Sequence, residues 1–361
     1  MKPFTWQQIY QQVNRDLIGK DSYRGITLTY AWLANQFGHF SLGFIPTVLL
    51  HFFLKSSNPG IVWFFSLLKV NLPLPNAEYW SAFLVWGAWI LFETYNFLKP
   101  LLWKKPSRKK ALNNGKYVFQ PAWTNVTFDT ITDLGYFGIG ALTASLICNF
   151  HQGMLMGLLL LITLIAYPAY YWYTRKMLLQ NADYPFQLRL SQWNNIIKEA
   201  NVTYILDFLK QKPKGKHILI FGSRGTGKTA LAVALATEAS LNTTCCSYVT
   251  AVKLLSMFYD PMDVEFERSL WDWRKSDLLV IDDINPGRPV RSDIISTNLF
   301  YEILNNLDNG PYNIEHIRDK NILWVMGSDD PTNKLEEKWK LLLNQIGVED
   351  SNIKVIDLEE E

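Results

Sequence analysis

Residues 217–229 read HILIFGSRGTGKT. The first five, HILIF, contain four apolar residues, two of them β-branched, which predicts a short buried strand. The next eight, from Gly222 to Thr229, match the phosphate-binding pattern G-x-x-x-x-G-K-[ST]. The run ALAVALATEAS at 230–240 then predicts a helix. Strand, loop and helix follow in the order in which this pattern binds nucleotides, so the stretch decides the fold of the second half of the chain.

The residue types of this loop suit a triphosphate. Glycines allow consecutive backbone N–H groups to turn towards the phosphates, and the helix that follows points its positive end at them. We expect Lys228 to reach the β and γ oxygens and the Thr229 hydroxyl to bind Mg²⁺. The candidate cofactors are therefore ATP and Mg²⁺. The candidate nucleotide-binding residues are Gly222, Ser223, Arg224, Gly225, Thr226, Gly227, Lys228, Thr229 and Ala230.

A second apolar run ends in two acidic residues. The sequence DLLVIDDIN at 277–285 predicts a buried strand that leads into Asp282 and Asp283. Asp282 is placed to hold Mg²⁺ through water, and Asp283 is placed to polarise the water that attacks ATP. Thr229 and Asp282 are thus the candidate metal ligands, and Lys228 and Asp283 are candidate catalytic residues.

Three further apolar runs complete the pattern. NILWVMGSDDP at 321–331 predicts a strand that ends in polar residues, and CCSYVT at 245–250 and IKVIDL at 353–358 predict two more. A helical stretch, TNLFYEILNNLDNG, lies at 297–310. Five strands that alternate with helices predict an α/β P-loop domain with a five-stranded parallel sheet covered on both faces.

This half of the chain resembles the AAA+ family of ATPases over roughly residues 200–358. KPKGKHILIFGSRGTGKTALAVALA resembles the entry to an AAA+ module, LLVIDDIN its Walker B strand, and LNNLDNG its Leu-Asp-x-x pattern before sensor 1. GSDDP stands where the family usually has Ala-Thr-Asn-Arg-Pro, so the resemblance places Asp329 at the sensor 1 asparagine and makes it a third catalytic candidate. The Asp-Asp form of Walker B resembles the helicase-loader-like branch. AAA+ modules commonly form rings, which implies a homo-oligomer.

The chain also departs from that family. Asp283 replaces the usual Walker B glutamate, and no arginine follows Arg318. Most AAA+ modules have an arginine finger after sensor 1. Here Arg288, Arg291, Arg318 or a partner protein would have to replace it, although each arginine also fits a solvated surface charge. We expect the domain to lack the usual AAA+ lid. These departures imply a slow hydrolase or a nucleotide-holding switch.

The first half of the chain has a different composition. Hydrophobic residues make up 48% of the whole chain and charged residues 19%. Residues 1–200 carry 17 Lys and Arg against 8 Asp and Glu, whereas residues 201–361 carry 18 against 25. A basic half and an acidic half indicate two environments. The N-terminus is polar and amphipathic, without the apolar core of a signal peptide, and the three cysteines show no metal-ligand spacing.

Four apolar stretches approach the roughly 20 residues that a helix needs to cross a bilayer. They lie at 30–54, 79–98, 131–150 and 154–173. We therefore expect a four-helix membrane region at 30–174. The fourth stretch fits best, and the first fits least well because it contains Asn35, Gln36, His39 and Pro46. The shorter run IVWFFSLL at 61–68 predicts an interfacial segment.

Lysine and arginine placement orients this region. The N-terminal segment, the loop at 99–130 and the residues after the fourth stretch are basic, whereas the loops after the first and third stretches hold few or no basic residues. Four crossings with both termini on the cytoplasmic side place every basic segment in the cytoplasm and every loop with few or no basic residues on the opposite side. We expect an integral multi-pass protein in the inner or plasma membrane of a prokaryote. The basic loop would face anionic headgroups, with a nucleic-acid patch as the alternative.

Two features inside the apolar stretches have functional and structural interpretations. Glu93 is the main ionisable residue, and it is either functional or close enough to the interface to reach water. Gly135, Gly138 and Gly140 predict close helix packing rather than a pore.

These observations divide the chain into four segments and leave three functions open. The segments are a cytoplasmic N-terminal segment at 1–29, the membrane region at 30–174, a helical linker at 175–213 and an AAA+-like NTPase domain at 214–361. The first hypothesis is a membrane-anchored ATPase that drives assembly or remodelling of a membrane-associated protein partner. The second is a nucleotide-gated membrane effector, channel or scaffold with little ATP turnover. The third is a membrane-tethered DNA-handling ATPase, which the acidic second half disfavours because DNA binding requires phosphate neutralisation.

Overall fold

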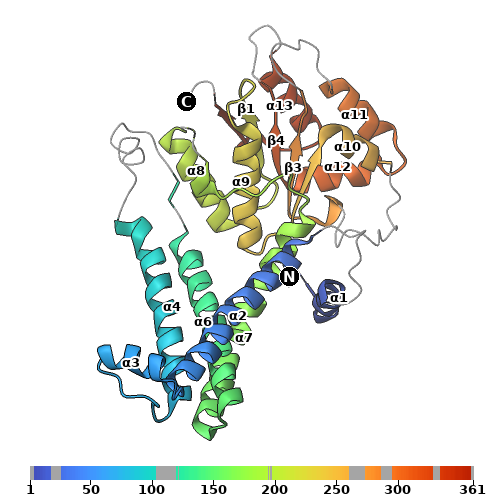
Figure 1. Cartoon of the computed structure of the whole chain (residues 1–361). Coiled ribbons are helices and arrows are strands. Elements are labelled where there is room, and N and C mark those ends of the chain that lie inside the picture. The colour runs from blue at the N-terminus through green and yellow to red at the C-terminus, as the bar shows by residue number, and fades with distance from the viewer. Residues whose placement is uncertain are drawn as a thin grey trace. The chain divides into compact units, whose positions relative to one another are not determined.

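The chain folds into two units, which we describe separately. The computed structural model describes residues 4–17, 26–102, 119–120, 122–193, 195, 197–259, 273–285, 295–327 and 334–358. One unit consists mainly of Met177–Glu361 and contains the sheet (Figure 1). The other consists of Trp6–Lys105 and Ala122–Lys176 and is helical.

The first unit is built on a five-stranded sheet in which every neighbouring pair is parallel, as the sequence predicts. The strand order is β2-β3-β4-β1-β5. The strands are β1 (His217–Phe221), β2 (Cys246–Thr250), β3 (Leu278–Asp282), β4 (Asn321–Val325) and β5 (Ile353–Asp357). Because all strands point the same way, the residues that follow β1, β3 and β4 meet at one edge of the sheet.

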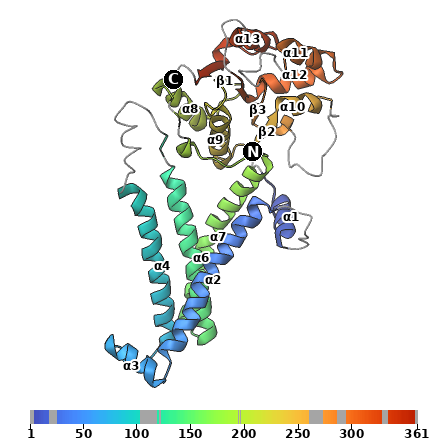
Figure 2. The ribbon, with the colours of Figure 1, turned by 45° about the horizontal axis from the view of Figure 1, so that its top comes forward.

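Helices cover both faces of this sheet (Figure 2). Alternate residues of β1 enter two different cores, because successive side chains of a strand point to opposite faces. Ile218 and Ile220 pack with the residues of α8 and α9, whereas Leu219 and Phe221 pack with the residues of α10 to α13. The helices are α8 (Glu199–Gln211), α9 (Lys228–Leu241), α10 (Ala251–Met257), α11 (Thr297–Asn306), α12 (Gly310–Asp319) and α13 (Leu335–Gln345).

A buried histidine links β1 to the central strand β4. His217 in β1 is fully buried, and its Nδ1 accepts a hydrogen bond of 3.1 Å from the indole N–H of Trp324 in β4. Its Nε2 lies 3.4 Å from the carbonyl oxygen of Arg318, so the neutral tautomer with a proton on Nε2 satisfies both contacts. Burial lowers the pKa of His217 to about 4.

This histidine predicts an acid-sensitive domain. The unfolded chain takes up a proton near pH 6.5, whereas folded His217 does so only near pH 4, so the free energy of unfolding falls as the pH drops between these values. The free energy of unfolding falls by about 3 kcal/mol in total. The free energy of unfolding of the full-length protein is measured by denaturant unfolding at pH 7 and at pH 5. The difference between the two pH values should be smaller for His217→Gln than for wild type. The exposed His151→Gln serves as the control, and equal pH dependence in wild type and His217→Gln would contradict the assignment.

The second unit is a bundle of long helices (Figure 2). Three of them, α2, α6 and α7, are long and apolar enough to cross a membrane. The helix α4 is 26 residues long, but over the residues that the structure describes it is not apolar enough to count as a fourth candidate span. Its three Trp and two Tyr side chains lower its mean hydropathy. The helices are α1 (Trp6–Leu17), α2 (Leu28–Leu54), α3 (Pro59–Leu67), α4 (Ala77–Leu102), α6 (Trp123–Cys148) and α7 (Gln152–Asn181).

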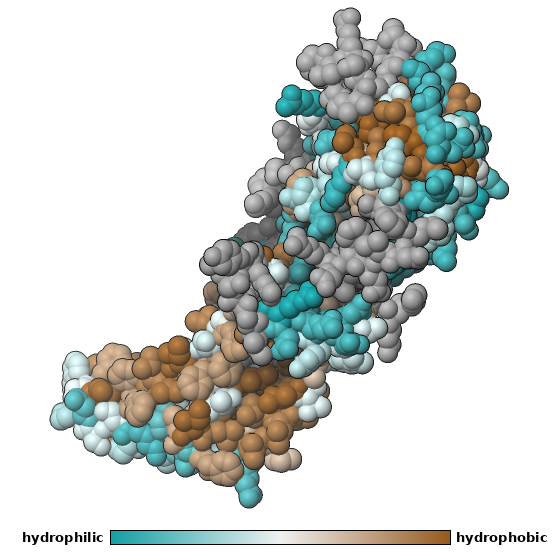
Figure 3. Space-filling view, turned by 90° about the vertical axis from the view of Figure 1, so that its right-hand side faces the viewer, coloured by the Kyte–Doolittle hydropathy of each residue, from teal (hydrophilic) through white to brown (hydrophobic). Residues whose placement is uncertain are grey.

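The bundle exposes large apolar side chains (Figure 3). Contiguous apolar surface of this kind is rare on monomeric soluble proteins and marks a surface that binds another protein or a membrane. Examples on α2, α4 and α7 are Leu42, Ile45, Leu49, Phe52, Phe83, Leu91, Phe92, Leu160 and Leu164.

Glycines allow α2 and α6 to approach backbone to backbone. A Cβ on Gly43 of α2 would lie 2.1 Å from the carbonyl oxygen of Phe137, and a Cβ on Gly140 of α6 would lie 2.0 Å from that of Phe40. Gly135 and Gly138 also lack space for a Cβ, because side chains of α7 and α4 pack directly against them. The prediction that the glycines of the third stretch serve close packing is therefore confirmed.

A polar pair between the same two helices was missed by the sequence reasoning, which singled out Glu93. The Nδ1 of His39 in α2 lies 3.0 Å from the carboxylate of Asp133 in α6. Gln36 donates a hydrogen bond of 3.3 Å to the same carboxylate oxygen. Neither helix alone reveals this pairing, because the two positions come together only when α2 and α6 pack.

The close approach of α2 and α6 predicts a strong effect of one substitution. Gly140→Leu should push the two helices apart and destabilise the bundle by about 1–3 kcal/mol or more, because its Cβ has no space beside the Phe40 carbonyl. Gly157→Leu in α7 is the matched control, since a Cβ there meets nothing within 4 Å. Thermal stability in detergent, read as the fraction that stays monodisperse after heating, should fall for Gly140→Leu and not for Gly157→Leu.

Candidate functional site

The loop between β1 and α9 has a backbone conformation that favours glycine. Gly222, Gly225 and Gly227 have φ of 152°, 91° and 86°, in the region that L side chains rarely adopt. A Cβ on Gly222 would also lie 2.6 Å from the Thr226 hydroxyl oxygen. Gly227 is the N-cap of α9, whose first residue is Lys228. The loop therefore ends at a helix N-terminus, where backbone N–H groups and the helix dipole favour an anion.

Hydrogen bonds to one carbonyl group hold this loop. The oxygen of Ser223 accepts bonds from the Thr226 hydroxyl at 2.9 Å and from the Lys228 ammonium at 2.8 Å. Lys228 thus lies folded across the loop, within the space that the glycines keep open. Thr229 and Ala230 form the first turn of α9 behind it, and the Arg224 side chain is exposed.

The two aspartates stand at the carboxyl end of β3. Asp282 is buried, and its carboxylate accepts a 2.8 Å hydrogen bond from the Tyr248 hydroxyl and another of 2.8 Å from the backbone N–H of Asp283. Burial and the charge of Asp282 raise the pKa of Tyr248, so this residue stays a donor. The two bonds fix the Asp282 carboxylate and leave further lone pairs for water or a metal ion.

Asp283 shares an electrostatic environment with Asp282 and Lys228. Desolvation and the negative charge of Asp282 raise the pKa of the Asp283 carboxyl, and the positive charge of Lys228 opposes this shift. Its backbone has φ of 56°, which turns the chain sharply after the strand. The structure thus brings Lys228 together with Asp282 and Asp283, which follow it by more than 50 residues in the sequence. A raised pKa makes the Asp283 carboxylate a better proton acceptor.

An asparagine connects this site to the end of β4. The side-chain oxygen of Asn285 accepts a hydrogen bond from the backbone N–H of Gly327 at 2.5 Å. The next residues, Ser328 and the catalytic candidate Asp329, lie outside the described residues, as do Arg288 and Arg291.

Arg318 does not reach the phosphate-binding loop of its own chain. It lies in the last turn of α12, just before β4 begins, and its guanidinium pairs with Asp319 at 2.7 Å. This position is at the amino edge of the sheet, whereas the loop is at the carboxyl edge. Its interpretation as a replacement arginine finger stays a prediction.

The segment before α8 contacts the phosphate-binding loop directly. We call residues 182–193 with Asn195 the strap. The Trp193 indole donates a 3.1 Å hydrogen bond to the carbonyl of Gly227, and the Asn195 side chain donates one to the carbonyl of Thr226. Neither residue belongs to a recognisable motif, so sequence reasoning missed both.

The strap runs along α9 from one end of the helix to the other. Near the C-terminal end of α9, the Tyr184 and Ser240 hydroxyls lie 2.9 Å apart. Further along, the guanidinium of Arg189 forms a bidentate pair with the carboxylate of Glu238, at 2.7 and 3.0 Å. The strap thus ties the loop to the residues that directly follow α7.

The strap predicts a measurable effect on nucleotide affinity. Trp193→Phe removes one of the two hydrogen bonds to the Gly227 carbonyl, which also accepts from the backbone N–H of Leu231, and the loss costs about 1 kcal/mol. We expect ATP to bind the full-length protein about five-fold more weakly. Isothermal titration calorimetry would show this, with the exposed Trp63→Phe as the control. Equal affinities for wild type and Trp193→Phe would mean that the strap does not support the loop.

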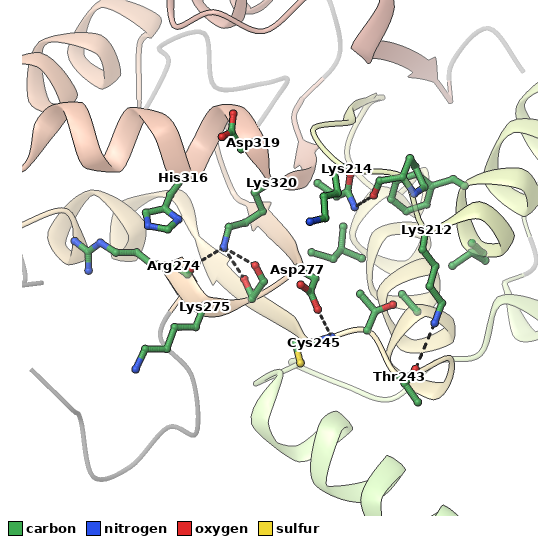
Figure 4. Close-up of a pocket in the computed structure, with 18 residues that line it drawn as sticks. Lys212, Lys214, Thr243, Cys245, Arg274, Lys275, Asp277, His316, Asp319 and Lys320 are labelled. Carbon is green, nitrogen blue, oxygen red and sulfur yellow. Dashed lines mark hydrogen bonds between the residues drawn. The ribbon is translucent and has the colours of Figure 1, made fainter. Parts of the chain in front are cut away.

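A hollow of about 730 Å³ lies at the opposite, amino edge of the sheet (Figure 4). Basic side chains line it, but several already bind backbone oxygens. The ammonium of Lys320 donates to the carbonyls of Trp273, Arg274 and Ser276, and that of Lys212 donates to the Asn242 carbonyl. Helix carbonyl ends gather at this edge, so these cations satisfy orphaned acceptors. The hollow is not the nucleotide site.

Comparison with known proteins agrees with this site. Residues 174–309 match the model of a family described as IstB-like ATP binding protein, over less than half of the chain. The matched residues include the strap, the phosphate-binding loop and both aspartates, so this part of the chain is a P-loop ATPase module, as predicted. A solved structure titled "Crystal Structure of the DnaI" is 17% identical, over 51% of this chain and 90% of that chain, with a TM-score of 0.29, too low to compare the folds. No curated protein matches the chain.

Proposed function

We propose that the protein is a membrane-anchored ATPase that binds ATP with Mg²⁺ on the cytoplasmic side. The observation that carries this proposal is the meeting of Lys228, Asp282 and Asp283 at one edge of the sheet, beside a loop that ends at a helix N-terminus. The loop and Lys228 hold the phosphates. Mg²⁺, when bound, neutralises phosphate charge, and Thr229 and Asp282 are the residues that would hold it. Asp283 orients and polarises the attacking water.

Four observations support the membrane anchor. Three helices are long and apolar enough to span, and α4 adds a fourth of 26 residues, about 39 Å long. The bundle exposes many large apolar side chains along its long helices. The basic segments of the sequence fall on one side of a four-span arrangement with both termini in the cytoplasm. The short helix α3 exposes Trp63, Phe64 and Leu67 at the other end of α2 and α4.

The proposal also includes the partners of the protein. A homo-oligomer follows from the AAA+ resemblance, and a protein partner at the membrane is the substrate of assembly or remodelling. The strap favours one second function, a nucleotide-gated effector, because it connects the loop to the residues that follow α7. DNA remains disfavoured by the acidic balance of 201–361.

Steady-state hydrolysis of ATP by the full-length protein in lipid tests this function. Asp283→Asn should lower the turnover number on the order of 100-fold while ATP still binds, because the general base is lost. Lys228→Ala should abolish both turnover and tight binding. Asp277→Asn, at the other end of the same strand, and Lys214→Ala, at the amino edge, are the matched controls and should behave as wild type.

Two outcomes would decide against hydrolysis as the function. If ATP binds tightly and turnover of wild type does not exceed that of Asp283→Asn, with or without lipid, the site is a switch and the effector function replaces the ATPase. If wild type does not bind ATP, both functions fail.

A further inference from the structure

The helix α1 has three distinct faces. At 100° per residue, Trp6, Tyr10, Val13 and Leu17 form one stripe, and the side chains of Trp6, Tyr10 and Leu17 are 72%, 67% and 59% exposed. The adjacent face carries the buried residues Ile9, Gln12 and Asp16. The remaining face is polar: Gln7, Gln11, Asn14 and Arg15. One apolar face is therefore left open to the surroundings although the helix is already packed on its neighbour.

A buried carboxylate fixes α1 on the bundle. Asp16 is 3% exposed and accepts hydrogen bonds from the Tyr173 hydroxyl at 2.8 Å, from the Thr27 hydroxyl at 2.9 Å and from the Gln12 amide at 3.0 Å. Thr27 is also the N-cap of α2, and its hydroxyl accepts from the backbone N–H of Tyr30. The network places α1 beside the first turn of α2 and beside the end of the apolar part of α7.

Both of these helix ends have the composition of a membrane–water boundary. The Trp6 ring lies 5.2 Å from that of Tyr170, and the guanidinium of Arg175 lies 3.8 Å above the Tyr171 ring. Aromatic and basic residues of this kind mark the headgroup level. The sequence around α1 is also basic, with Lys2, Arg15, Lys20 and Arg24 against Asp21 and the buried Asp16.

We propose that α1 is an interfacial helix that lies in the plane of the bilayer surface. Its stripe of Trp6, Tyr10 and Leu17 enters the boundary between headgroups and acyl chains, in the leaflet where α2 begins. The occupant of this face is lipid, and anionic headgroups are favoured because the surrounding charges are basic. The proposal rests on the proposed membrane anchor, and it assigns the N-terminal segment to the membrane surface rather than to the cytosol.

Site-directed spin labelling of the full-length protein tests this placement. The background carries Cys148→Ala, Cys245→Ala and Cys246→Ala and is accepted only if it stays monodisperse and binds ATP. Single cysteines for labelling are then introduced as Tyr10→Cys or Trp6→Cys in the stripe, Gln11→Cys on the polar face, and Leu160→Cys on the exposed apolar side of α7. Vesicles of phosphatidylcholine with phosphatidylglycerol provide the bilayer.

The readout is the accessibility of each label to oxygen, which enters lipid, and to a water-soluble nickel chelate. The labels at 6, 10 and 160 should be more accessible to oxygen than to nickel, and the label at 11 should show the reverse. The preference at 6 and 10 should weaken in vesicles of phosphatidylcholine alone.

Three results would overturn the proposal. If the label at 160 contacts lipid while those at 6 and 10 are open to nickel, α1 lies in water and the anchor alone stands. If the labels at 6 and 10 are shielded from both reagents, protein covers the stripe, as a second copy would. If the label at 160 is open to nickel as well, the membrane anchor itself is wrong.

Discussion

The junction between β1 and α9 constrains the nucleotide unit more than any other feature. A buried strand has to turn into a helix within six residues, and the turn leaves room for a phosphate only if Gly222, Gly225 and Gly227 adopt their positive φ values. The strand is fixed by parallel pairing to β4 and β5 on its two sides. The loop is thus a short connection between two rigid elements, which keeps its backbone donors in place before a ligand arrives.

The two edges of the sheet carry opposite partial charges, which come from the helix ends. Helix N-termini and Lys228 gather near the carboxyl edge, and the aspartates after β3 balance them. Helix C-termini gather at the amino edge, where Lys212 and Lys320 donate to backbone carbonyls. The same charge type therefore serves ligand binding at one edge and internal capping at the other. This explains why a hollow lined with lysines does not by itself indicate a site.

Much of the fold follows from local sequence signals, and much of the site does not. The strands were predictable because runs such as HILIF are short and apolar, and the loop because its glycines and Lys228 follow a fixed spacing. Tyr248 and Trp193 were not, since each meets its partner across 34 residues of chain through a hydrogen bond that no period encodes. The pairing of His39 with Asp133 likewise depends on helix packing.

The network around Asp16 has a consequence for how the protein is made. Asp16 and Tyr173 are 157 residues apart, so the carboxylate is synthesised long before the hydroxyl that completes its hydrogen bonds. At roughly 5–20 residues per second, translation leaves a delay on the order of 10 seconds. During that time the first helix has no docking place on α7. The N-terminal segment reaches its final position only after the last helix of the bundle has been synthesised, so its docking is a late step in folding although its sequence comes first.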